Sequence, residues 1–136
     1  MKGITFIILC ISLHIAAQIS PNINQYNKQG KKHGIWKGYH ENTQTKRYEG
    51  EFNHGTPVGR FTYYAIEGHV NGKVDFINDS ISSAQMFHDN GSVMAEGKFL
   101  NQTKSGKWYI YSRSGYLLNV LHYSNGALEG LSLIHI

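Results

Sequence analysis

Cysteine, proline and charge are all scarce in this chain. Its single cysteine, Cys10, lies in an apolar run near the N-terminus, so no disulfide bond can form within the rest of the chain. Only 2 of the 136 residues are proline, 16% are charged, and no segment after residue 17 shows the apolar period of about 3.6 residues that a long amphipathic helix requires. A disulfide scaffold and a helical bundle are therefore both excluded.

Long apolar runs are also missing, apart from the one at residues 4–15. This run is about a dozen residues long, which is shorter than the roughly 20 residues that a membrane-spanning helix needs. Lys2 precedes the run and a small-residue site ending at Ala17 follows it, as in a secretory signal peptide. We expect cleavage to remove residues 1–17, to leave no transmembrane segment, and to release the protein to the periplasm or exterior of a bacterial cell. A retained membrane anchor is the alternative.

The charge that remains is mild. Removal of residues 1–17 leaves 12 basic and 9 acidic residues, a net charge of +3. This charge and the export signal argue against binding to nucleic acid. The one local basic cluster contains Lys31, Lys32 and Lys37. These lysines either belong to a solvated turn between strands, the interpretation that we favour, or form a basic edge that attracts anionic lipid or glycan.

Motifs for catalysis are missing as well. The sequence has no Gly-x-Ser-x-Gly turn and no glycine-rich phosphate loop, and its one cysteine would leave with the signal peptide. Eight histidines are scattered without the compact spacing of a metal site. Glu49 and Glu96 occupy equivalent repeat positions, so we interpret them as structural rather than as paired catalytic acids. We therefore expect no enzyme activity, no metal ion and no cofactor.

Glycine and aromatic residues, by contrast, are abundant and form a repeat. The pattern Gly-x-aromatic-x-x-aromatic occurs at residues 34–39, 59–64 and 106–111. Alignment on its glycine gives units at 34–58, 59–81, 82–105 and 106–129, with a period of about 24 residues. The third unit lacks both the glycine and the first aromatic residue, so its opening is either a loop insertion or an eroded repeat. The aromatic spacing favours an eroded repeat.

Each unit has the length and the turn residues of a β-hairpin. Turn glycines lie at Gly68, Gly91 and Gly115, and the dipeptides ending at Gly91 and Gly126 are Asn-Gly, which tolerates the positive φ of tight turns. We predict an all-β fold with almost no helix. Four hairpins would form an elongated, single-layer antiparallel meander of about eight strands over residues 34–130, preceded by an irregular lead-in at residues 18–33.

The repeated aromatic residues predict how the sheet is held together. Trp36, Phe61 and Trp108 would form one row, and Phe52, Phe76, Phe99 and Tyr123 a second. Cross-strand neighbours in such rows contribute about 0.2 to 1 kcal/mol each. The glycine two residues before each first aromatic residue, at Gly34, Gly59 and Gly106, would allow a close backbone approach or a bend in the strand.

A third set of aromatic residues suggests a binding surface. The two aromatic residues of each pattern copy are three residues apart, which places them on opposite faces of a regular strand. Either the strand bends, or the second residues line a second, partly exposed face; a sheet curled over both rows is the alternative without a binding surface. This candidate binding row consists of Tyr39, Tyr64, Phe87 and Tyr111.

These elements together resemble a known repeat family. The segments Gly-Lys-Lys-His-Gly-x-Trp at 30–36 and Glu-Gly-x-Phe at 49–52 and 96–99 are similar to the MORN-variant repeats of the YwqK-type antitoxin-like family, over roughly residues 24–130. The chain departs from that family in its third unit and in its export signal. Related MORN repeats bind proteins or phospholipids, so the resemblance implies a binding or scaffolding module without catalysis.

The sequence therefore predicts an exported, non-catalytic repeat module that binds an unidentified protein partner or cell-envelope component. Binding of anionic lipid or glycan and antitoxin-like inhibition of a partner protein are the alternatives. The last residues, 131–136, match no repeat position and resemble adapter-derived read-through in metagenomic gene sequences. We expect this tail to be artefactual and the natural C-terminus to be missing.

Overall fold

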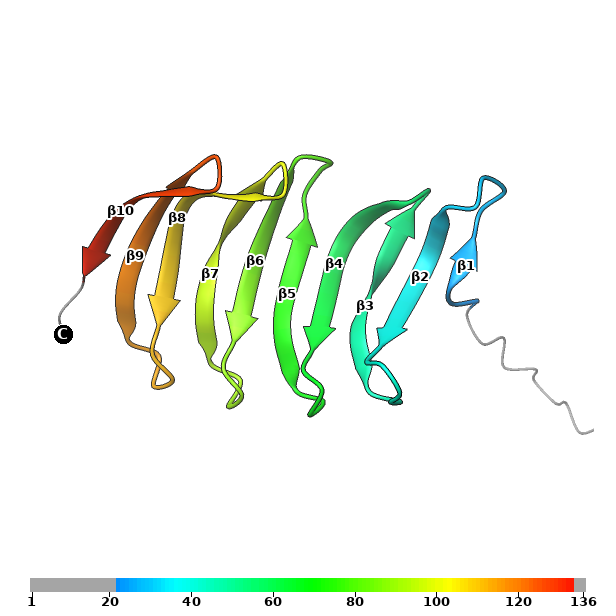
Figure 1. Cartoon of the computed structure of the whole chain (residues 1–136), viewed down its shortest axis with the longest axis horizontal. Helices are drawn as coiled ribbons and strands as arrows, with labels where there is room; N and C mark the ends of the chain where they lie inside the picture. Colours follow the sequence, from blue (N-terminus) through cyan, green and yellow to red (C-terminus); the bar gives the residue numbers. More distant parts are fainter. Residues whose placement is uncertain (1–21, 134–136) are drawn as a thin grey trace, which may run out of the picture.

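The structure of this protein is a computed structural model that describes residues 22–133, with side chains described through residue 131. The predicted signal peptide lies outside the described residues. The described part is all-β, and its ten antiparallel strands follow one another in sequence order in one open meander (Figure 1). Residues 22–133 contain no helix that is long and apolar enough to span a membrane.

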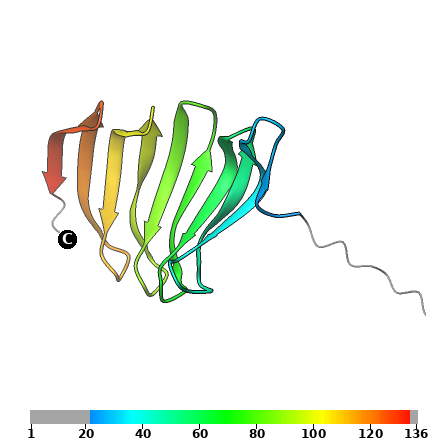
Figure 2. The ribbon, with the colours of Figure 1, turned by 45° about the vertical axis from the view of Figure 1, so that its right-hand side comes forward.

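The strands are β1 (Gln25–Tyr26), β2 (Lys32–Tyr39), β3 (Lys46–Asn53), β4 (Thr56–Tyr64), β5 (Val70–Phe76), β6 (Ile81–Phe87), β7 (Val93–Leu100), β8 (Thr103–Tyr111), β9 (Leu117–Ser124) and β10 (Ala127–Leu133). The predicted number of about eight strands is wrong by two. Strand β1 lies within the predicted irregular lead-in, and β10 continues into the predicted tail, where Leu133 pairs with Asn119 of β9. A view turned by 45° shows a single layer of strands in the described part of the chain (Figure 2).

The two faces of this layer carry different side chains. Side chains alternate between the faces along each strand, so neighbours in sequence such as Trp108 and Tyr109 point in opposite directions. One face, here called the aromatic face, carries Trp36, Phe52, Phe61, Phe76, Phe99, Trp108 and Tyr123. The other, here called the polar face, carries Lys37, Glu49, Arg60, Lys73, Asp75, Gln85, Glu96, Lys98, Lys107 and Tyr109. The two predicted aromatic rows therefore interleave on one face.

Edge-to-face contacts connect the rings of the aromatic face. The ring centroid of Phe61 lies 5.1 Å from that of Phe52 and 5.3 Å from that of Phe76. The ring centroids of Phe99 and Trp108 are 5.2 Å apart. Such pairs contribute about 0.5 to 1.5 kcal/mol beyond the burial of their surface. Phe61 is 2% exposed and Trp108 1% exposed, so the rings cover one another without a second sheet. The aromatic ladder is thus the core of this part of the fold.

Two glycines make room for these rings. A Cβ atom placed on Gly50 would lie 2.5 Å from three ring atoms of Phe61, and one on Gly97 would overlap the indole of Trp108. Each ring therefore lies directly on the backbone of the neighbouring strand. The Trp108 indole N–H also donates a hydrogen bond to the carbonyl of Lys98 at 3.1 Å, which satisfies its polar edge. The sequence showed Glu-Gly-x-Phe as a motif, but the contact that requires its glycine was not predicted.

The pattern glycines have a different role, which is to bend the strand. Gly34, Gly59 and Gly106 have φ of 78°, 63° and 68°, a conformation that favours glycine. The register shifts opposite Gly59 and Gly106, where β4 and β8 bulge against the preceding strands. The predicted bend is therefore confirmed at these two glycines. The predicted close approach is wrong, because no atom lies within 4 Å of a Cβ at any of the three.

Strand β6 shows what happens where the pattern is degenerate. Ser82 and Ala84 stand in place of the glycine and the first aromatic residue, and β6 pairs with β5 without any register shift. It also pairs with β7 along its whole length, so the interpretation as a loop insertion is wrong. The aromatic ladder is interrupted here. Ala84 and Ala95 pack instead against Trp108 in one buried cluster.

Candidate functional site

The candidate binding row lies at one end of the polar face. Its members are the last residues of β2, β4, β6 and β8, namely Tyr39, Tyr64, Phe87 and Tyr111. These four strands run in the same direction, because alternate strands of an antiparallel meander are parallel to each other. With two strand spacings between them, successive members lie about 10 Å apart. A register shift directly precedes each one.

Charged side chains of the polar face surround the row. The Lys46 ammonium lies 4.8 Å from the ring centroid of Tyr64, and that of Lys73 lies 5.5 Å from the ring of Phe87. The Tyr111 hydroxyl donates a hydrogen bond of 2.8 Å to Glu96 Oε1, and this contact raises the pKa of Tyr111. Of the sequence alternatives, the structure therefore places the row on a second face. Tyr39 is the most open member, with 45% of its surface exposed.

Two histidines fix the backbone of the row. His40 Nε2 lies 2.9 Å from the carbonyl oxygen of Tyr64, and His88 Nε2 lies 3.0 Å from that of Tyr111. A carbonyl can only accept, so each ring donates its Nε2–H. His40 directly follows Tyr39 and donates to Tyr64, and His88 directly follows Phe87 and donates to Tyr111. The bonds therefore connect the row members in two pairs. In the sequence these histidines looked scattered. The usable signal was their spacing, because His40 precedes Tyr64 by 24 positions and His88 precedes Tyr111 by 23.

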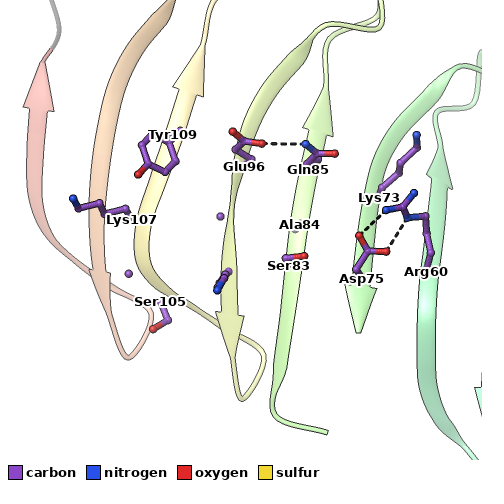
Figure 3. Close-up of a pocket in the computed structure, with 13 residues that line it drawn as sticks. Arg60, Lys73, Asp75, Ser83, Ala84, Gln85, Glu96, Ser105, Lys107 and Tyr109 are labelled. Atoms are coloured by element: carbon purple, nitrogen blue, oxygen red, sulfur yellow. Dashed lines mark hydrogen bonds and ion pairs between the residues drawn. The ribbon is translucent and has the colours of Figure 1, made fainter. Parts of the chain in front are cut away.

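A shallow trough of about 620 Å³ occupies the centre of the polar face, across β4 to β8 (Figure 3). Arg60 donates two hydrogen bonds, of 2.7 and 2.8 Å, to the carboxylate of Asp75, and this pairing holds the pKa of Asp75 below its usual range. Gln85 donates to Glu96 at 3.0 Å. Lys98 and Lys107 are exposed at the trough and form no ion pair within the described residues.

The trough was not predicted, because its residues meet only through strand register. Asp75 is 15 positions from Arg60 in sequence, yet the two residues are directly opposite each other on β4 and β5. One usable signal for the polar face was the residue between the glycine and the first aromatic residue of the repeat pattern. That residue is Arg60 in the second unit and Lys107 in the fourth, and alternation places it opposite the buried ring. Alternation along the sequence therefore indicates which residues lie on the polar face, but not which of them meet across neighbouring strands.

The trough offers recognition chemistry rather than an obvious catalytic arrangement. Its two carboxylates are engaged, Asp75 by a guanidinium and Glu96 by an amide and a phenol. Between residues 22 and 133, no three histidine, aspartate or glutamate side chains lie close enough to hold a metal ion. What remains free is a mixture of ammonium groups, hydroxyls and the ring of Tyr109, which can bind a surface of complementary charge.

The predicted basic edge does not assemble. Lys32 lies on the aromatic face, with its ammonium 4.5 Å from the ring centroid of Trp36. Lys37 lies on the polar face, 3.6 Å from Glu49 Oε1, in a cluster where Lys46 lowers the pKa of Glu49. Lys31 lies in the turn before β2. Because the ammonium groups of Lys32 and Lys37 lie on opposite faces of the sheet, the three lysines do not form one anion-binding surface.

Comparison with known proteins adds no relative of this chain. No family model matches the sequence, and neither a curated protein nor a solved structure gives a significant match. The geometry of the two faces is therefore the basis for any functional assignment.

Proposed function

We propose that this protein is an exported, non-catalytic repeat module that binds a protein partner of the cell envelope through its polar face. The observation that carries the proposal is the row of Tyr39, Tyr64, Phe87 and Tyr111, which lies on the polar face beside the charged trough, with Tyr39 exposed and the other three members half-buried. Tyrosine is enriched in protein interfaces because its ring supplies apolar area while its hydroxyl bonds to polar groups.

The shape of the surface supports a protein as the partner. An extended sheet presents a long, open face, whereas small ligands bind in enclosed pockets. The trough and the row together contain cations, carboxylates and aromatic rings, which suit the mixed chemistry of another protein surface. A polyanion would favour cations alone. The placement of Lys32 and Lys37 on opposite faces likewise gives little support to anionic lipid or glycan as the ligand.

We also propose that β2 to β9 are four MORN-variant repeats of two strands each. Supporting this are the left-handed glycines at the start of three units, the paired histidine bonds, and the glycines beneath Phe61 and Trp108. In this proposal, the repeats space the members of the row evenly. The partner surface would then have contacts at a matching interval of about 10 Å.

The test is affinity capture from the envelope fraction of the source organism, with the full chain as bait. One variant carries Tyr64→Ser and Tyr111→Ser. A matched control carries Tyr26→Ser and Tyr116→Ser, two tyrosines outside the row that are 63% and 60% exposed. The proposal predicts a defined protein that the wild type and the control retain and the row variant loses. Equal retention by all three baits, or no retained protein, would contradict it.

A further inference from the structure

Two lysines of this protein cover aromatic pairs on the aromatic face. The ammonium of Lys32 lies 4.5 Å from the ring centroid of Trp36 and 5.1 Å from that of Phe52. The ammonium of Lys104 lies 5.0 Å from the ring of Trp108 and 5.1 Å from that of Tyr123. Both lysines are half-buried. A cation above an aromatic face is stabilised by the negative charge density of the ring.

The centre of the same face has the rings without the lysine. Phe76 on β5 and Phe99 on β7 lie on either side of Ser82, which is paired with both. The residue two positions before Ser82 is Ser80, as Lys104 is two positions before Gly106. The carbonyls of Lys32, Ser80 and Lys104 each accept a backbone hydrogen bond from the next hairpin turn, at 2.8, 2.7 and 3.0 Å. Ser80 thus occupies the place of a covering lysine.

A hollow of about 580 Å³ lies at this position. The rings of Tyr63, Phe76 and Phe99 line it, and Asp79 and Ser80 stand at its rim. No lysine or arginine of the described chain lines it. Ser80 lines the hollow at the position where Lys32 and Lys104 cover the rings of their own units, so the rings here are left without a covering lysine.

The charge at the rim matches a cation. Asp79 is exposed and forms no ion pair with any residue in the range 22–133. Asp75, Glu49 and Asp89, by contrast, each pair with a lysine or arginine. A carboxylate without an ion pair that lines the same hollow as aromatic rings is a combination that suits an ammonium group.

We propose that this hollow binds an n-alkylammonium group, and that its natural occupant is a lysine side chain of a protein partner. The chain's own Lys32 and Lys104 supply the template, because each places a primary ammonium and its apolar stem over two rings. The incoming lysine would put its stem on Phe76 and Phe99 and its ammonium toward Asp79. The hollow lies on the aromatic face, whereas the candidate binding row lies on the polar face. The test of the hollow is therefore independent of the proposed function.

The experiment is an NMR titration of the full-length protein with ¹³C-labelled phenylalanine rings. The probe is n-butylammonium, and the neutral isostere n-butanol is the control. Butylammonium should shift the ring signals of Phe76 and Phe99 and bind at least about threefold more tightly than butanol. Equal affinity for the two probes, or shifts confined to other rings, would overturn the proposal. Tighter binding of tetramethylammonium than of butylammonium would overturn the assignment to lysine.

Two further variants locate the site. Asp79→Asn should weaken butylammonium binding about two- to fivefold, whereas Glu51→Gln, an exposed carboxylate on β3 without an ion pair in the described part of the chain, should leave it unchanged. Ser80→Lys should abolish binding, because the new side chain would occupy the hollow as Lys104 covers its own pair. Binding that persists in a folded Ser80→Lys protein would contradict the proposal.

Discussion

The two faces of this sheet are built from adjacent residues yet have opposite properties. On β8, Trp108 is 1% exposed and packs on the backbone at Gly97, while Tyr109 lines the open trough on the other side. The aromatic face is stabilised by ring contacts that exclude water, and the polar face by ion pairs that remain hydrated. In this single-layer sheet, one face therefore supplies most of the stability, while the other face remains hydrated.

Truncation of the two neighbours on β8 should show the largest difference between the faces. Trp108→Ala should lower the free energy of unfolding by about 3 to 5 kcal/mol, because it removes a fully buried ring and leaves a cavity. Tyr109→Ala should lower it by less than about 1 kcal/mol, since its ring is only half-buried. Urea unfolding followed by circular dichroism measures both changes. Losses of equal size would mean that the faces share the stability.

A change to the backbone beneath the ring should have the next largest effect. Gly97→Val would place side-chain atoms in the volume of the Trp108 indole, so we expect a loss of about 2 to 4 kcal/mol. Lys98→Val is the matched control on the same strand, because its side chain points to the polar face and a β-branched residue suits a strand. If both variants unfolded at the same urea concentration, the ring could not lie on Gly97.

The pattern glycines should show a smaller effect with a different cause. Gly106→Ala adds only a methyl group in open space, but the φ of 68° is unfavourable for any residue with a Cβ. We expect the free energy of unfolding to fall by about 1 to 2 kcal/mol, measured by thermal or urea unfolding.

Ser82→Gly makes the converse change at the equivalent position on β6. It should not restore a bulge by itself, and a gain in stability would contradict this explanation of the degenerate unit.

The smallest effect should come from titration of the polar face. Lys46 holds the pKa of Glu49 below its ordinary value of 4.5, so the folded protein binds this proton less readily than the unfolded chain. The pair's contribution is present above pH 4.5 and is lost as pH falls through the lower folded pKa. Glu49→Gln should therefore reduce the urea midpoint slightly at pH 7 and not at pH 3. A larger difference between the urea midpoints of the wild type and Glu49→Gln at pH 3 than at pH 7 would contradict the lowered pKa of Glu49.

Much of this fold could be predicted from the sequence, because strand alternation and turn glycines are local. The meander, the absence of helix between residues 22 and 133, and the bend at Gly59 and Gly106 all follow from spacing. Properties that depend on pairing register were not predictable. Nothing near Gly97 indicates that Trp108 lies on it, and the ion pair of Arg60 with Asp75 joins residues 15 positions apart.

The candidate site shows the same limit. The row of Tyr39, Tyr64, Phe87 and Tyr111 was visible as a repeat, and its placement on a second face was one of the stated alternatives. The basic edge was inferred from lysines close in sequence, but alternation sends Lys32 and Lys37 to different surroundings. The hollow near Phe76 was hidden, since a missing lysine is noticed only when the lysines over the other rings are known.

The accessibility of tryptophan reports directly on whether the aromatic face excludes water, because both tryptophans of the chain lie on that face. Trp36 is 8% exposed and Trp108 1% exposed. Acrylamide quenching of the native protein, compared with the protein in concentrated urea, reports their exposure. We expect weak quenching that becomes strong on unfolding, with Trp36→Phe showing the least quenching because only Trp108 remains. Native quenching as strong as that of the unfolded chain would show that the aromatic face is open to water and would contradict the account.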